Sequence, residues 1–232
     1  MSADNHFIFA MVDGPSESNS TSSYQERPCE GALMRILSFV FTAYGDQVGS
    51  YVCVRHWRTP IPLSSHRQPP RLFGYAEKVN RWIRLARVTG RYSILIFLAD
   101  NDRFSDTPSR QDQLAAGIAA ALCDDSPPHR PIVIDGVAVE MIESWLLSDP
   151  ELVAHKQSLP AGKCTEEFWG DERDQSSHHP KCLLLRHVCA PRNWDYSDCI
   201  QHWNVGKAVE NSPSLRCFVE KLRQAATELD LR

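Results

Sequence analysis

The 232-residue sequence lacks long apolar runs, internal repeats and closely spaced cysteine pairs. No stretch approaches the ~20 consecutive apolar residues that a membrane-spanning helix needs. The first apolar run, residues 7–12, is too short for a signal peptide and has no basic flank, so we expect a cytoplasmic protein without membrane attachment. The eight cysteines include no C-x-x-C pair, and in a reducing compartment we expect them to be free thiols.

Potential zinc ligands gather in one segment of the second half of the chain. Cys164 precedes this segment, which holds three histidines and two cysteines within twelve residues: His178, His179, Cys182, His187 and Cys189. Their spacing does not match the C-x₂-C and H-x₃₋₅-H pairs of standard zinc sites. We therefore favour exposed histidines followed by cysteines that are buried as small apolar side chains.

Predicted strands and helices alternate along the first 150 residues. Short apolar runs predict four strands, at residues 7–12, 50–57, 93–99 and 131–134. Apolar residues at helical spacing predict four helices, at residues 30–43, 75–88, 110–122 and 138–147. This alternation predicts an α/β fold with a parallel sheet, in which strands 7–12, 93–99 and 131–134 are neighbours. We expect residues 1–150 to form this domain and residues 151–232 to form an irregular and mainly helical extension packed on it.

Acidic residues follow three of the predicted strands. Asp13 follows the first strand, Asp100 and Asp102 follow the third, and Asp135 follows the fourth. Ligands of open α/β sheets bind at the carboxyl ends of the strands. Side chains at positions i and i+2 share a face, so Asp100 and Asp102 can bind one ion. Hard oxygen ligands suit Mg²⁺ or Mn²⁺, and we expect Asp13, Asp100 and Asp102 to meet as metal ligands.

Two other classes of protein also use a D-x-D motif. A metal-dependent glycosyltransferase would bind a nucleotide sugar with it, but would not require acids after the first and fourth strands. A phosphoaspartyl phosphatase carries its D-x-D after the first strand, whereas here the motif follows a later one.

A basic stretch precedes this acidic region. Residues 55–91 contain nine Arg or Lys and one acid, Glu77, whereas residues 92–176 contain sixteen acids and six Arg or Lys. Arg81, Arg84 and Arg87 lie on one side of the predicted helix 75–88, and arginine binds phosphate with two parallel hydrogen bonds. A solvated helix face is the alternative explanation. Basic and acidic regions side by side indicate a nucleic-acid-processing site, with these arginines on the same side as the acids.

The order of these motifs resembles the Toprim domain of topoisomerases, primases and OLD-type nucleases. It is closer to a Toprim-like group catalogued as domain-of-unknown-function family 4276. The resemblance rests on five short segments, whose sequences are VDGPSE (residues 12–17), PCEGALMRIL (residues 28–37), ESWLLSD (residues 143–149), Pro180-Lys181 and SPSLRCFVEKL (residues 212–222). Asp13 stands where the family usually has Glu, and residues 16–28 look like an insertion.

The resemblance implies a nuclease that uses Mg²⁺ or Mn²⁺ to cleave DNA or RNA. Asp13, Asp100, Asp102 and Glu143 would bind the ions, and Glu140 is a further candidate. Glu30, slightly favoured over Glu17 because it heads the next helix, would complete the site or relay a proton. Lys181 or Lys207 would neutralise the transition state.

The resemblance also implies a cellular setting. Family members often accompany an ATPase of a phage-defence system, so we expect an effector subunit with an ATPase partner. A homo-oligomer is compatible with this expectation. A non-catalytic sensor or regulatory subunit of such a complex is the alternative function, which the Asp13 position favours and the full acidic set disfavours.

Overall fold

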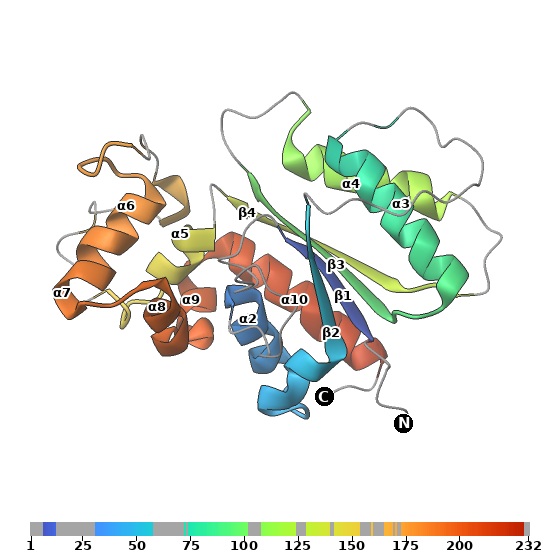
Figure 1. Cartoon of the computed structure of the whole chain (residues 1–232), viewed down its shortest axis with the longest axis horizontal. Coiled ribbons are helices and arrows are strands. Elements are labelled where there is room, and N and C mark those ends of the chain that lie inside the picture. Colours follow the sequence, from blue (N-terminus) through green and yellow to red (C-terminus); the bar gives the residue numbers. More distant parts are fainter. Residues whose placement is uncertain are drawn as a thin grey trace.

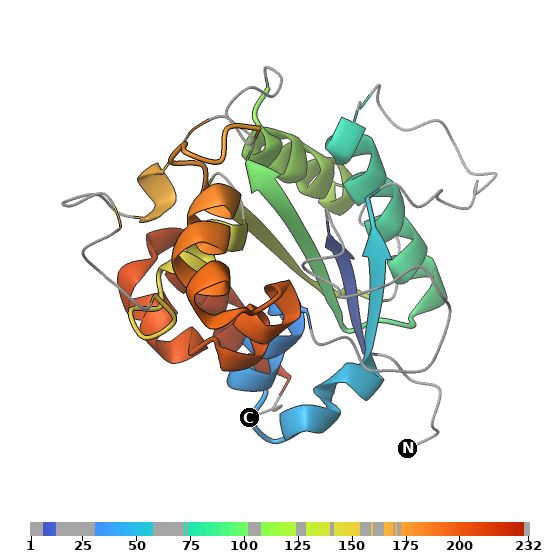
Figure 2. The same cartoon turned by 60° about the vertical axis from the view of Figure 1, so that its left-hand side comes forward.

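The sheet is parallel, as predicted, and its four strands lie in the order β2-β1-β3-β4. The computed structural model of the chain describes residues 7–12, 31–57, 72, 74–101, 108–123, 129–139, 142–153, 159, 165–168, 170 and 173–229. The strands are β1 (Ile8–Val12), β2 (Val52–His56), β3 (Ile94–Asn101) and β4 (Ile132–Val139). Figure 2 shows β1, β2 and β3 side by side with their arrowheads pointing the same way. The predicted adjacency of the first, third and fourth strands is confirmed.

Alternating residues of each strand face two separate hydrophobic cores. In β3, Ile94, Ile96 and Leu98 pack into one core, whereas Leu95, Phe97 and Ala99 pack into the other. All five residues of β1 are buried, which explains why its sequence is continuously apolar and not alternating.

One face of the sheet is covered by α3 (Gly74–Thr89) and α4 (Arg110–Leu122), and we call it the α3/α4 face (Figure 1). Both helices start at the carboxyl edge of the sheet and run back to the other edge, as crossover helices of parallel strands must. They approach closely at Gly117, where an added Cβ would lie 2.5 Å from the carbonyl oxygen of Ala76.

The opposite face is covered by α2 (Ala32–Val40) and α10 (Pro213–Glu228), and we call it the α2/α10 face (Figure 1). Its core extends from Ile8 in β1 to Ala226 in α10. The described part of the C-terminal extension therefore shares one core with the sheet, and α10 packs along β4.

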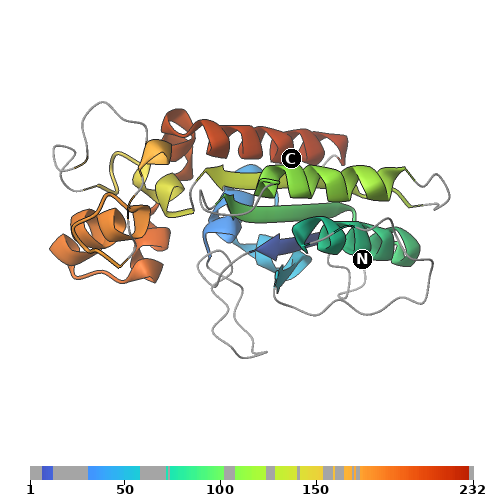
Figure 3. The ribbon, with the colours of Figure 1, turned by 90° about the horizontal axis from the view of Figure 1, so that it is seen from above.

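The remaining helices form a lobe beyond the carboxyl ends of the strands (Figure 3). The lobe contains α5 (Ile142–Leu147), α6 (Pro180–Leu184), the π-helical turn η4 (Leu185–Cys189), α7 (Ala190–Arg192), α8 (Tyr196–His202) and α9 (Val205–Asn211). Two 3₁₀ helices complete the described elements, η1 (Gly45–Tyr51) and η3 (Thr165–Glu167). Within the described ranges, no helix combines the length and apolar character needed to cross a membrane.

The prediction that the fourth strand ends before Asp135 is wrong. β4 continues to Val139 and pairs with β3 along its whole length, so Asp135 lies opposite Phe97 in the middle of the strand. Gly136 pairs with Leu98 of β3, and its lack of a side chain leaves room for the ring of Phe218, 2.6 Å from the position of an added Cβ. Because residues 138 and 139 belong to β4, the helix predicted at 138–147 is shortened, and α5 extends from Ile142 to Leu147.

Candidate metal site at the carboxyl edge of the sheet

The carboxyl edge of the sheet is formed by the ends of β1 at Val12, β2 at His56 and β3 at Asn101. Val12 and His56 are paired in register. Five of the predicted site residues lie outside the described residues: Asp13, Glu17, Glu30, Asp102 and Glu140. Asp100 and Glu143 are the predicted metal ligands that the structure describes.

Asp100 is the penultimate residue of β3 and is partly buried. Strand alternation places its side chain on the α2/α10 face, together with Ile96 and Leu98. Its Oδ1 accepts a hydrogen bond of 3.2 Å from the backbone N–H of Ile142, the first residue of α5. This bond orients a carboxylate at the strand end, which is the placement that a metal ligand requires.

Glu143 follows Ile142 in the first turn of α5 and is only 4% exposed. The next part of the helix belongs to the core. Trp145 is fully buried, its ring stacks on Phe218 at 5.8 Å, and its Nε1 donates to the Ser214 hydroxyl at 2.7 Å. Two of the segments that carry the family resemblance, ESWLLSD and SPSLRCFVEKL, therefore pack against each other, with Trp145 in the core.

Glu166 of η3 stabilises the same contact from the other side. Its carboxylate is buried and accepts hydrogen bonds from the Ser212 hydroxyl, the Ser214 backbone N–H at 3.0 Å and the Ser214 hydroxyl at 2.8 Å. Ser212 is the N-cap of α10, so a carboxylate lies at the positive end of that helix. The SPS sequence is explained by helix capping.

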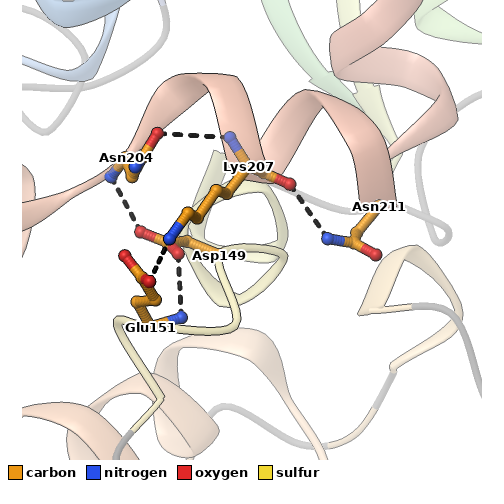
Figure 4. A network of polar contacts seen from close by, with 5 residues as sticks. All are labelled: Asp149, Glu151, Asn204, Lys207 and Asn211. Atoms are coloured by element: carbon orange, nitrogen blue, oxygen red, sulfur yellow. Dashed lines mark hydrogen bonds and ion pairs between the residues drawn. The ribbon is translucent and has the colours of Figure 1, made fainter.

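Asp149, the last residue of the ESWLLSD segment, is fully buried and joins two segments of the lobe (Figure 4). It accepts hydrogen bonds from the backbone N–H groups of Glu151 at 2.9 Å and Asn204 at 2.7 Å. Asn204 caps α9 by accepting from the backbone N–H of Lys207 at 3.2 Å. Asp149 thus connects the end of α5 to the start of α9, which is a structural role.

The two predicted catalytic lysines lie in different surroundings. Lys207 forms an ion pair with Glu151, beyond the end of α5 that is remote from Ile142 (Figure 4). Six residues of helix separate the ends of α5 by about 9 Å, so this pair lies away from Asp100. Lys181 is partly buried in α6, which packs against α5.

The arginines of α3 do not form the exposed face that the sequence predicts. Arg87 is 2% exposed and its Nη1 donates to the carbonyl oxygen of Ala121 at 2.6 Å, at the end of α4. Arg81 is paired with Glu77 one turn earlier, and Arg84 is partly buried. The prediction for Arg87 is wrong because the packing of α3 against α4 draws its side chain into the helix interface.

The position of α3 also differs from the prediction. Its helix covers the α3/α4 face, whereas the side chain of Asp100 lies on the α2/α10 face. Arg87 lies near the end of α3, about 9 Å further from the carboxyl edge than Arg81. The arginines are therefore not on the side of the sheet where Asp100 points.

The predicted burial of cysteines is confirmed for Cys182 and Cys189, whereas His179 is buried and not exposed as expected. His179 is the N-cap residue of α6. Cys189 Sγ lies 3.2 Å from Cys199 Sγ, and both thiols are buried. Across the described part of the chain, no group of three or more His, Cys, Asp or Glu side chains is placed to bind a metal ion.

Sequence analysis did not identify a cluster of aromatic and basic side chains at the same edge. Trp57 follows β2, and its Nε1 donates to the carbonyl oxygen of Leu98 at 2.8 Å. Its ring lies 4.5 Å from that of Tyr75, whose other neighbour is the Arg110 guanidinium at 4.0 Å. Lys78 donates to the carbonyl oxygen of Trp57. The sequence signal was an aromatic residue directly after a strand and an arginine at the start of a helix, which are common features.

His56, at the end of β2, has a pKa below its usual value because burial disfavours the charged imidazolium.

No family model, no curated protein and no solved structure matches the chain. The geometry of the carboxyl edge therefore carries the functional conclusion.

Proposed function

We propose that the protein is a Mg²⁺- or Mn²⁺-dependent phosphodiesterase that cleaves nucleic acid. The observation that carries this proposal is the placement of Asp100, an oriented carboxylate at the carboxyl edge of a parallel sheet. Ligands of open α/β sheets bind at this edge, and a carboxylate oxygen is the donor that both ions prefer. The resemblance to Toprim-like nucleases supports the same chemistry.

Asp100 would bind the metal together with Asp13 and Asp102, which are adjacent in sequence to the ends of β1 and β3. Glu143, in the first turn of α5, would serve a second ion, and Glu30 would complete the site. A bound divalent ion would activate water and stabilise the charge that develops on the phosphodiester.

Between the two lysines, the lobe geometry favours Lys181 as the group that neutralises the transition state. Its helix packs against α5, whose first residue contacts Asp100. Lys207 is paired with Glu151 at the far end of α5. In the cell, we propose an effector subunit of a prokaryotic defence system that works with an ATPase.

The test compares Asp100→Asn with wild type on labelled single- and double-stranded DNA and RNA, in Mg²⁺, in Mn²⁺ and with chelator. Asparagine keeps an oxygen for the Ile142 N–H, so the fold should persist while metal-dependent cleavage is lost. Asp135→Asn is the matched control, because Asp135 lies in the middle of β4 and contacts Lys221 at 2.8 Å. Equal activity of wild type and Asp100→Asn, with an ATPase partner present, would overturn the proposal and favour a non-catalytic subunit.

A further inference from the structure

Four side chains at the carboxyl edge form what we call the Arg110 cluster: Trp57, Tyr75, Lys78 and Arg110. They come from the end of β2 and from the first turns of α3 and α4. The tyrosine ring contacts both other planar groups, the indole at 4.5 Å and the guanidinium at 4.0 Å. The indole itself is held by the Leu98 carbonyl. The cluster therefore fixes the arginine in place.

No acid in the described part of the chain neutralises the cations of this cluster. Among the described residues, the Arg110 guanidinium has no carboxylate partner, and its buried Nε has no hydrogen-bond partner. The Lys78 ammonium contacts the neutral carbonyl of Trp57 and no described carboxylate. Both side chains and Tyr75 are partly exposed. An arginine that is held on an aromatic ring without a counter-ion is suited to bind an anion from solution.

The cluster lies close to the candidate metal ligand but on the other face of the sheet. Trp57 binds the carbonyl of Leu98, two residues before Asp100 in β3, which is about 7 Å along the strand. A single phosphate cannot reach both places. A nucleic-acid backbone that passes around the end of the strand can reach both places if it bends sharply. A single strand bends in this way, whereas a duplex is too stiff.

We propose that the Arg110 cluster is a docking surface for the phosphodiester backbone of a single-stranded nucleic acid. This inference rests on the proposed nuclease function, because the same strand would cross the carboxyl edge at Asp100. Arg110 and Lys78 bind consecutive phosphates, while Trp57 and Tyr75 hold the guanidinium in position. Because the contacts are to the backbone, the surface does not discriminate base sequence.

The experiment measures binding of a fluorescein-labelled single-stranded oligonucleotide by anisotropy, in chelator so that no cleavage occurs. Each phosphate contact to a single strand contributes about 0.7 to the slope of log Kd against log salt. We expect Arg110→Ala to reduce this slope by about 0.7 and the double variant with Lys78→Ala by about 1.4. Arg110→Lys, which keeps the charge and loses the planar group, should retain the slope and bind more weakly.

Arg223→Ala is the matched control. Arg223 also lies over an aromatic ring, with its Cζ 5.3 Å from the centroid of Phe39, but it belongs to α10 on the opposite face. Its removal should leave affinity and slope unchanged. Melting temperatures of all variants report whether each one folds.

The outcomes separate this inference from the nuclease proposal. Oligonucleotide binding that depends on Arg110, without cleavage in any metal, supports the docking surface and refutes the nuclease. Metal-dependent cleavage with a slope that Arg110→Ala leaves unchanged refutes the docking surface alone. Displacement of the oligonucleotide by poly-glutamate at equal charge concentration would also overturn it, because the surface would then bind acidic proteins equally well.

Discussion

Replacing Asp149 with alanine should destabilise the protein strongly, although this residue lies outside the candidate metal site. The carboxylate is fully buried and accepts two backbone hydrogen bonds, from Glu151 at 2.9 Å and Asn204 at 2.7 Å (Figure 4). A hydrogen bond to a charged group contributes roughly 1.5–3 kcal/mol, and an orphaned buried donor costs a similar amount. We therefore expect Asp149→Ala to lower the free energy of unfolding by about 3–5 kcal/mol.

Two variants of the same network provide the comparison. Asp149→Asn keeps one acceptor oxygen and places an amide N–H₂ against the other donor, so its cost should be about 2 kcal/mol. Lys207→Met removes the ion pair with Glu151, whose side chains are 39% and 63% exposed. Such an exposed pair contributes less than about 1 kcal/mol, and methionine keeps the apolar stem.

Urea unfolding followed by circular dichroism measures these differences, and melting temperatures check them. For a chain of this length about 4 kcal/mol corresponds to a decrease of roughly 10 °C. The reasoning is refuted if Lys207→Met costs as much as Asp149→Ala, because the exposed ion pair and not the buried carboxylate would then hold α5 and α9 together.

Three further predictions concern other parts of the fold. Gly117→Ala should lower the melting temperature, because a close contact with the Ala76 carbonyl at 2.5 Å outweighs the ~1 kcal/mol gain in helix propensity; a higher melting temperature would contradict this. Treatment with the oxidant diamide should join Cys189 and Cys199, whose sulfur atoms are 3.2 Å apart, in a disulfide that stabilises the fold by about 3 kcal/mol. Mass spectrometry should show that the wild type loses two hydrogens and that Cys199→Ser does not. An unchanged mass of the wild type would refute this prediction. Burial lowers the pKa of His56 from 6.5, so the unfolded chain takes up this proton first as the pH falls. The contribution of neutral His56 to stability is complete above pH 6.5 and is lost as the pH falls through the lower folded-state pKa. The free energy of unfolding of His56→Gln should therefore depend less on pH in this range than that of the wild type, and identical pH profiles would contradict the prediction.

The strands β1 and β3 were predictable from the sequence because they are buried on both faces. Continuous apolar runs such as residues 7–12 need no distant information to be recognised. The end of β4 was not predictable, since Asp135-Gly136 is locally a turn sequence. These residues pair with β3, and the space beside Gly136 is filled by Phe218, which is 82 residues away in the sequence.

The helical character of residues 151–232 was predicted and is confirmed for the described residues, but the contacts that hold the lobe together were not predictable. The lobe helices share the apolar core of the sheet, and buried polar contacts between residues distant in sequence also join their segments. Asp149 binds the backbone of Asn204, and Glu166 binds Ser212 and Ser214, over separations of 46 to 55 residues. No local pattern distinguishes such an acid from one on the surface.

The candidate site was predictable where it depends on strand ends and not where it depends on helix contacts. Asp100 lies at the carboxyl edge because it follows an apolar run. Arg87 and Arg110 both occur in helices, and only the packing of α3 against α4 decides that the first is buried and the second remains partly exposed.

The shared core of β1 and α10 affects how the protein folds during its synthesis. Ile8 and Phe218 belong to one hydrophobic cluster, so the part of the α2/α10 face that α10 covers stays exposed until the ribosome has made and released this helix. At translation rates of ~5–20 residues per second, the roughly 90 residues from the end of β4 to the end of α10 take about 4–18 s. During that interval the nascent chain exposes an apolar sheet face, which is the surface that chaperones bind. Ribosomes stalled before residue 213 should therefore carry a chaperone-bound and protease-sensitive chain, whereas stalling after α10 has left the exit tunnel should give a compact one.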